Sequence, residues 1–92
     1  MKTYIISYDL LGPETREDYL RLIEHIKSYT YWAKPLKSVW FIKTDKSVSE
    51  VRNDMKIFLD SNDKLIVLDV TNTNWASYNI ATSVGDWMKK NI

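Results

Sequence analysis

The sequence predicts an α+β fold in which strands and helices follow one another as β-α-β-β-α-β, with a further helix at the C-terminal end. The chain has 92 residues, the size of one small domain, and 45% of them are hydrophobic. Short runs rich in β-branched and aromatic residues alternate with segments whose apolar residues recur every three or four positions. We therefore expect a single domain over residues 1–92, with a core in residues 2–70 and a C-terminal helical segment in residues 75–92.

The first half begins with a strand over residues 2–9, because β-branched and aromatic residues dominate this run. The Leu11-Gly12-Pro13 segment then breaks it. Residues 15–29 are predicted to form an amphipathic helix, with Thr15 and Asp18 in a capping-box-like start. Its apolar stripe consists of Tyr19, Leu22, Ile23, Ile26 and Tyr29.

Two further strands are predicted over residues 30–33 and 36–43, separated at Lys34-Pro35. Ser47 and Glu50 have the spacing of a capping box and predict a helix over residues 48–60. Residues 64–70 are the most continuous apolar run of the chain and predict a strand. The last helix would be fastened by Trp75 and Trp87.

This order of elements is that of a ferredoxin-like βαββαβ sandwich with an additional C-terminal helix. We expect the first strand in the middle of the sheet, parallel to the third strand and antiparallel to the fourth, with both main helices on one face. The opposite face would carry exposed apolar residues. Self-association or the C-terminal helix should close it.

Composition excludes several classes of function. Lys and Arg number 13 against 12 Asp and Glu, so the formal charge of +1 indicates no strong field for nucleic acid or membranes. Without cysteine and with one histidine, the chain has no thiolate nucleophile, no Cys-based zinc site and no His-rich metal site. We find no signal-peptide pattern and no run of about 18 apolar residues, so a cytoplasmic protein without membrane contact is expected.

Asp9, at the end of the first strand, is the candidate metal ligand and catalytic residue. Two such carboxylates related by a dimer axis could bind a divalent cation. The alternative is that Asp9 caps the following turn. Asp45 is expected at the same edge of the sheet, whereas Asp69 should lie roughly 15 Å or more away. His25 lies off the apolar stripe of its helix and is expected to be solvated.

Basic and aromatic residues gather around the predicted hairpin, a mixture that can contact phosphates and stack on bases. The basic members are Lys34, Lys37, Lys43 and Lys46, and the aromatic members are Tyr31, Trp32 and Trp40. The alternative is that Trp40 faces the interior and that the lysines keep an edge strand soluble. The C-terminal Trp-containing helix is the candidate surface for a protein partner.

Three pieces of the sequence, Tyr8-Asp9-Leu10, Tyr31-Trp32 and Ser38-Val39-Trp40-Phe41, resemble the Cas-two proteins of CRISPR systems, their SinR-like relatives and the VapD toxins. The resemblance covers residues 3–70. It implies a ferredoxin-like homodimer in which Asp9 of each subunit faces the other across the twofold axis and binds a divalent metal. Some members of that family are metal-dependent nucleases and others are non-catalytic scaffolds. The helical C-terminal end looks more SinR-like than CRISPR-like.

The sequence thus predicts a Cas-two-like homodimer that is associated with nucleic acid or with a defence or toxin system and need not be catalytic. Lys34, Lys37 and Lys43 are its predicted nucleic-acid-binding residues. The alternative is a metal-dependent endonuclease, an endoribonuclease or a DNase, that uses Asp9 from both subunits with Mg²⁺ or Mn²⁺ to activate water.

Overall fold

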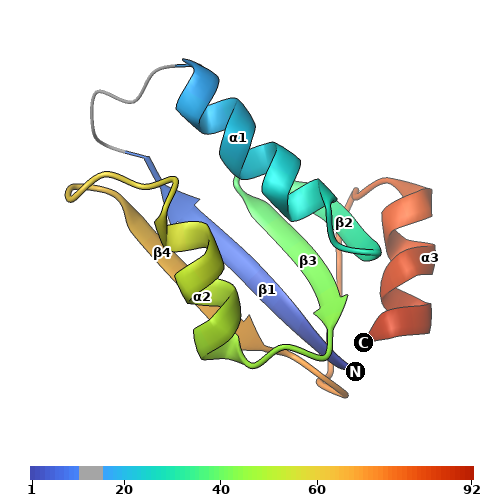
Figure 1. The fold of residues 1–92 in the computed structure, drawn as a ribbon. Helices are drawn as coiled ribbons and strands as arrows, with labels where there is room; N and C mark the ends of the chain where they lie inside the picture. The colour runs from blue at the N-terminus through green and yellow to red at the C-terminus, as the bar shows by residue number, and fades with distance from the viewer. Residues whose placement is uncertain (11–15) are drawn as a thin grey trace.

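The structure, a computed structural model, describes residues 1–10 and 16–92 and shows a mixed α+β architecture (Figure 1). Its elements follow the predicted order along the chain: β1 (Lys2–Asp9), α1 (Arg16–Lys27), β2 (Tyr31–Leu36), β3 (Val39–Thr44), α2 (Val48–Lys56), β4 (Lys64–Asp69) and α3 (Thr82–Asn91). The predicted breaker at residues 11–13 and the Thr15 cap lie outside the described residues.

The four strands form one sheet in the order β2-β3-β1-β4, and every neighbouring pair is antiparallel. The prediction that the first and third strands run parallel is therefore wrong. After α1, strand β2 runs in the same direction as β1. The β2–β3 hairpin then reverses the chain, so β3 is antiparallel to β1. The predicted antiparallel pairing of β1 with β4 is confirmed.

The hairpin turn lies at Lys37-Ser38 and not at the predicted Lys34-Pro35. Pro35 belongs to β2, where the register shifts between Ala33 and Leu36. Because β2 is at the edge of the sheet, its outer N–H groups have no ladder partner, and a proline is tolerated there. The register shift between Ala33 and Leu36 interrupts the regular pairing of β2 with β3 at the position of Pro35.

One face of the sheet packs against α1 and α2, which lie side by side across it (Figure 1). Alternation along β1 directs Tyr4, Ile6 and Tyr8 to this face. The other buried members of the core are Leu22, Ile26, Trp40, Ile42, Val51 and Met55. Half-buried side chains of β4, Leu65 and Val67, close the core at its edge. This face holds the hydrophobic core that the periodicity predicts.

Helix α2 begins with the predicted capping box. Ser47 Oγ accepts a hydrogen bond from the Glu50 amide at 3.1 Å, and Glu50 Oε1 accepts from the Ser47 amide at 3.0 Å. The helix ends at Lys56, four residues before the predicted residue 60. The amides of Phe58 and Leu59 bond to carbonyls three residues back, so the last turn tightens and the helix stops there.

Helix α3 covers only part of the opposite face of the sheet. The Trp87 ring stacks on Phe41 of β3 with centroids 5.9 Å apart, and Met88 is buried. The hydroxyl of Thr3 donates to the Asn91 carbonyl, which fastens the end of α3 to β1. The β1–β4 side of this face stays open, so the C-terminal helix closes one half of it.

The predicted helical segment over residues 75–92 is shorter in the structure, because α3 starts at Thr82. Trp87 belongs to α3 and packs on Phe41, so it is an anchor of the helix. Trp75 lies in the preceding connection, and its role as an anchor stays a prediction. Asn72 and Asn79, on either side of Trp75, have φ values of 58° and 61°, in the left-handed region. This conformation belongs to neither a strand nor a right-handed helix, so the chain between β4 and α3 is irregular. Within the described part of the chain, no helix has both the length and the apolar character needed to cross a bilayer.

Candidate functional site

Asp9 is the last residue of β1, is exposed, and lies opposite Lys64 of β4. Alternation along β1 places it on the face that carries Ile5 and Ser7, away from α1 and α2. Ser7 and Asp9 therefore share a face of the sheet. The residues after Leu10, where Asp9 would cap a turn in the alternative interpretation, lie outside the described part of the chain.

Two hollows flank Asp9. The larger, of about 460 Å³, is lined by Tyr8, Asp9, Tyr19, Lys37 and Ser38. The smaller, of about 160 Å³, lies on the β4 side and includes Lys64. The β2–β3 turn and the start of β4 thus bring one lysine to each side of the Asp9 carboxylate. We call Asp9, Lys37 and Lys64 the Asp9 end of the sheet.

A buried hydrogen bond fixes the position of Tyr8, which lines the larger hollow. Trp40 Nε1 donates to the Tyr8 hydroxyl at 3.1 Å, and Trp40 is 1% exposed. Burial raises the pKa of the Tyr8 phenol to about 12, against the opposing effect of the bond from Trp40. Tyr8 is therefore a neutral hydroxyl at every physiological pH, and it serves as a hydrogen-bonding group, not as a base.

The lysines predicted to bind nucleic acid do not form one patch. Lys37 belongs to the Asp9 end. The Lys34 ammonium lies 4.9 Å from the centre of the Trp40 ring. Lys43 pairs with Thr3 at the opposite end of β1. The β2–β3 strands separate the three residues along the sheet, and their binding of nucleic acid stays a prediction.

The other candidate carboxylates lie far from Asp9. Asp45 follows β3, whose last residue Thr44 pairs with Lys2, so the prediction that Asp45 shares an edge with Asp9 is wrong. The antiparallel direction of β3 is the cause. Asp69 pairs with Tyr4, five positions along the ladder from Asp9, in agreement with the predicted separation.

Among the side chains that the structure describes, no three or more His, Asp or Glu residues gather into a group that could hold a metal ion. Among the described residues that line the two hollows, Asp9 is the acidic one. A hard cation such as Mg²⁺ prefers several oxygen ligands, so a metal at Asp9 would draw the others from water and from a second copy of the chain.

The open half-face lies on the same side of the sheet as Asp9. We use this name for Ile5, Ser7, Val39, Ile66 and Leu68, which the register of β3, β1 and β4 places together on this face. Ile66 is 51% exposed and Leu68 48% exposed, although both lie in the middle of a strand. Adjacent exposed aliphatic residues of this kind are typical of an interaction surface.

Aromatic residues also gather at the edge of the sheet. The Trp32 and Trp40 rings lie 5.6 Å apart, and the Lys27 ammonium is 5.4 Å from the centre of the Trp32 ring. Trp40 is buried, as one of the two predictions for it required. Elsewhere, in the connection before α3, Tyr78 is 93% exposed and Trp75 36% exposed. A protein partner at the C-terminal Trp-containing helix stays a prediction.

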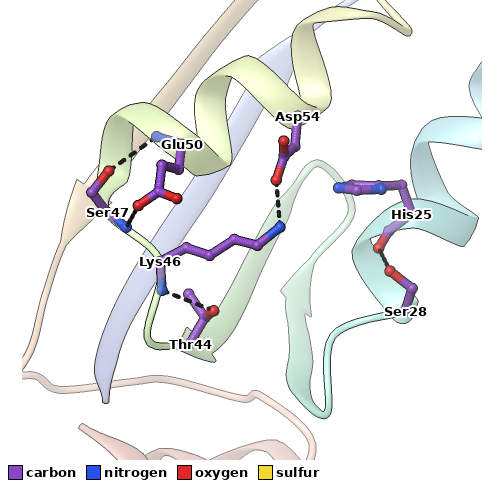
Figure 2. Close-up of polar contacts among 7 residues, drawn as sticks. All are labelled: His25, Ser28, Thr44, Lys46, Ser47, Glu50 and Asp54. Atoms are coloured by element: carbon purple, nitrogen blue, oxygen red, sulfur yellow. Dashed lines mark hydrogen bonds and ion pairs between the residues drawn. The ribbon is translucent and has the colours of Figure 1, made fainter.

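The prediction that His25 is solvated is wrong. The structure places its ring between α1 and the end of α2. The imidazole lies 5.4 Å from the Phe58 ring and 5.6 Å from the Tyr29 ring. Burial lowers the pKa of His25, with Asp54 opposing this effect and Lys46 adding to it. Figure 2 shows that Lys46 reaches across toward Asp54, where their side chains meet at 2.6 Å. The periodicity of α1 alone cannot reveal a neighbour supplied by α2.

We expect stability to fall as the pH drops below about 6.5, the unperturbed pKa of histidine. The unfolded chain then gains a proton that the folded chain, with its lower His25 pKa, does not yet bind. One such group gives a slope of at most about 1.4 kcal/mol per pH unit, which ends when the pH passes below the folded pKa. Urea unfolding between pH 5 and 8 measures it. His25→Gln should flatten this part of the profile, and an unchanged profile would contradict the assignment.

No protein-family model matches this chain.

Proposed function

We propose that this chain is a Cas-two-like protein that forms a homodimer through the open half-face and binds nucleic acid with the Asp9 end of the sheet. A ferredoxin-like arrangement is part of the proposal. It is supported by the βαββαβ order of the first six elements, by the place of β1 between β3 and β4, and by the two helices on one face.

The observation that carries the proposal is the exposure of Ile66 and Leu68 on the face that also bears Asp9. Covering these side chains removes apolar area from water and stabilises the assembly. A twofold interface uses the same patch on both subunits. Pairing two copies through the open half-face would therefore bring both Asp9 ends to one side of the dimer.

Each Asp9 end has two ammonium groups and one carboxylate among its named residues, so it carries a positive surplus. Lysines bind phosphate as point charges and release counterions, whereas the +1 charge of the whole chain contributes little. In a dimer the surplus is doubled. This local distribution of charge supports the phosphate backbone of a nucleic acid as the ligand.

The test compares wild-type protein with Lys37→Gln/Lys64→Gln in binding to single-stranded RNA and to double-stranded DNA. We expect weaker binding of the variant to the preferred polymer, and a salt slope that falls by about one for each phosphate that the variant no longer neutralises. The matched control is Lys89→Gln/Lys90→Gln, which removes two exposed lysines from α3. Equal reductions of affinity in both variants, or none in either, would remove the Asp9 end from the proposal.

A metal-dependent endonuclease is the second candidate. It is favoured by the exposed carboxylate of Asp9 on the proposed interface face, because a dimer supplies two such groups to one cation and its bound water. It requires cleavage that depends on Mg²⁺ or Mn²⁺ and that Asp9→Ala reduces to background while the dimer persists. EDTA and a size measurement on the variant provide the controls. Cleavage that survives Asp9→Ala, or a wild-type protein that does not cut, would eliminate this candidate.

A further inference from the structure

We propose that the β2 edge of the sheet binds an unpaired base of a single-stranded nucleic acid on Trp32, with Lys27 and Lys34 contacting the adjacent phosphates. We call these three residues the Trp32 platform. Through β3, Trp32 is level with Tyr4, five positions along β1 from Asp9, so the platform lies apart from the Asp9 end. The inference rests on the function proposed above and deepens it, since it names the form of nucleic acid that is bound.

All three side chains of the platform lie on the face of the sheet that α1 covers. Trp32 pairs with Ile42 of the core, so these two side chains share that face. Lys27 is the last residue of α1, and its ammonium lies 5.4 Å from the centre of the Trp32 ring. The Lys34 ammonium lies 4.9 Å from the ring of Trp40, which is also a core residue. One indole and two ammonium groups therefore meet at one place.

The fold holds Trp32 in position without burying it. Its ring lies against Trp40, with centroids 5.6 Å apart, and Trp40 is itself buried and hydrogen-bonded to Tyr8. Trp32 remains 37% exposed on an edge strand. A base that stacks on this ring does not have to order it first, which lowers the cost of binding.

The two lysines of the platform are available to an anion. Both are exposed, and neither Lys27 nor Lys34 forms an ion pair with any residue in the described ranges. Their ammonium groups lie beside indole rings, and such cation–π contacts are weak at exposed sites. A phosphate forms a stronger, charge-assisted contact with an ammonium. It can therefore bind both lysines without breaking a salt bridge.

The combination of side chains selects a single-stranded nucleic acid. An indole surface alone accepts many planar groups, and two lysines alone accept many anions. A single strand has an accessible base and a phosphate in each nucleotide, whereas the bases of a duplex are stacked on their neighbours. Stacking on an aromatic side chain also depends little on the identity of the base. The Trp32 platform therefore favours an unpaired strand of any sequence over a duplex.

The test measures, by fluorescence anisotropy, the binding of a labelled single strand of about ten nucleotides, made as RNA and as DNA. We expect Trp32→Ala to weaken binding of the preferred strand at least about fivefold, through the loss of one stacked base. A strand of abasic sites keeps the phosphates but has no base to stack. It should bind the wild-type protein more weakly than the ordinary strand does, and it should bind Trp32→Ala as well as it binds wild type.

The abasic strand also separates stacking from folding, since a partly unfolded variant would lose affinity for both strands. Trp75→Ala is the matched control, the same truncation at a tryptophan of similar exposure, and should leave affinity unchanged. Lys27→Gln/Lys34→Gln should lower the salt slope by about 0.7 for each phosphate contact that is lost. Equal weakening by Trp32→Ala and Trp75→Ala, or equal loss of affinity for both strands in Trp32→Ala, would overturn the proposal.

This proposal and the proposed function fail in different ways. Binding that Lys37→Gln/Lys64→Gln weakens, with no effect of Trp32→Ala or of the missing bases, would remove the Trp32 platform and leave the Asp9 end in place. Binding that depends on the bases and on Trp32, and that Lys37→Gln/Lys64→Gln leaves unchanged, would support the platform and remove the Asp9 end.

Discussion

Trp40→Ala is expected to lower the free energy of unfolding by about 3–5 kcal/mol, a large part of the total stability of a small domain. Trp40 is 1% exposed, packs against Trp32, and donates a hydrogen bond to Tyr8. Its truncation leaves a cavity in the core and removes one of the two hydrogen-bond partners of the Tyr8 hydroxyl, the other being Tyr19. Urea unfolding at a fixed protein concentration measures the change.

Trp40→Phe separates the two contributions, since it keeps an aromatic ring and removes only the indole N–H and part of the volume. We expect it to cost about 1–3 kcal/mol, the range for leaving a buried polar group unsatisfied. Trp75→Ala is the control with the same truncation to alanine at a site that is 36% exposed, where a cost of less than about 1 kcal/mol is expected. Similar costs at Trp40 and Trp75 would show that Trp40 does not have its assigned place in the core.

Leu68→Asp is expected to convert the proposed dimer into a monomer, with a rise of at least about a hundredfold in its dissociation constant. Leu68 is 48% exposed on β4, the edge strand of the open half-face, so a carboxylate there costs the isolated chain little. In a twofold interface the same substitution buries one charge from each subunit without a partner. Analytical ultracentrifugation over a range of protein concentrations measures the constant.

The matched control is Leu20→Asp, the same change at a residue of α1 that is 43% exposed and far from the open half-face in sequence and in the fold. It should leave the dissociation constant within about threefold of the wild-type value. A wild-type protein that is monomeric at every accessible concentration would refute self-association through this surface. Equal weakening by both substitutions would assign the effect to charge and not to the interface.

Local features of the sequence determined most of the secondary structure. The Ser47–Glu50 capping box specified the start of α2 by itself, because both of its hydrogen bonds lie within one turn. The apolar run that begins at Lys64 likewise specified β4 to within one residue. The alternation in β1 also placed Ser7 and Asp9 on one face, which follows from strand geometry alone.

Only the tertiary structure decided which of these elements meet. The direction of β3 relative to β1 is set by the return of the chain through α1 and its reversal at the β2–β3 hairpin, and it puts Asp45 at the end of the sheet away from Asp9. His25 became half-buried because α2 lies against α1, a contact that no periodicity within α1 encodes. The extent to which α3 covers the sheet depends on Trp87 meeting Phe41, which lies far earlier in the chain. Propensities and caps act within a few residues, whereas packing brings together residues far apart in sequence, so the sequence determined the elements and packing determined the sites between them.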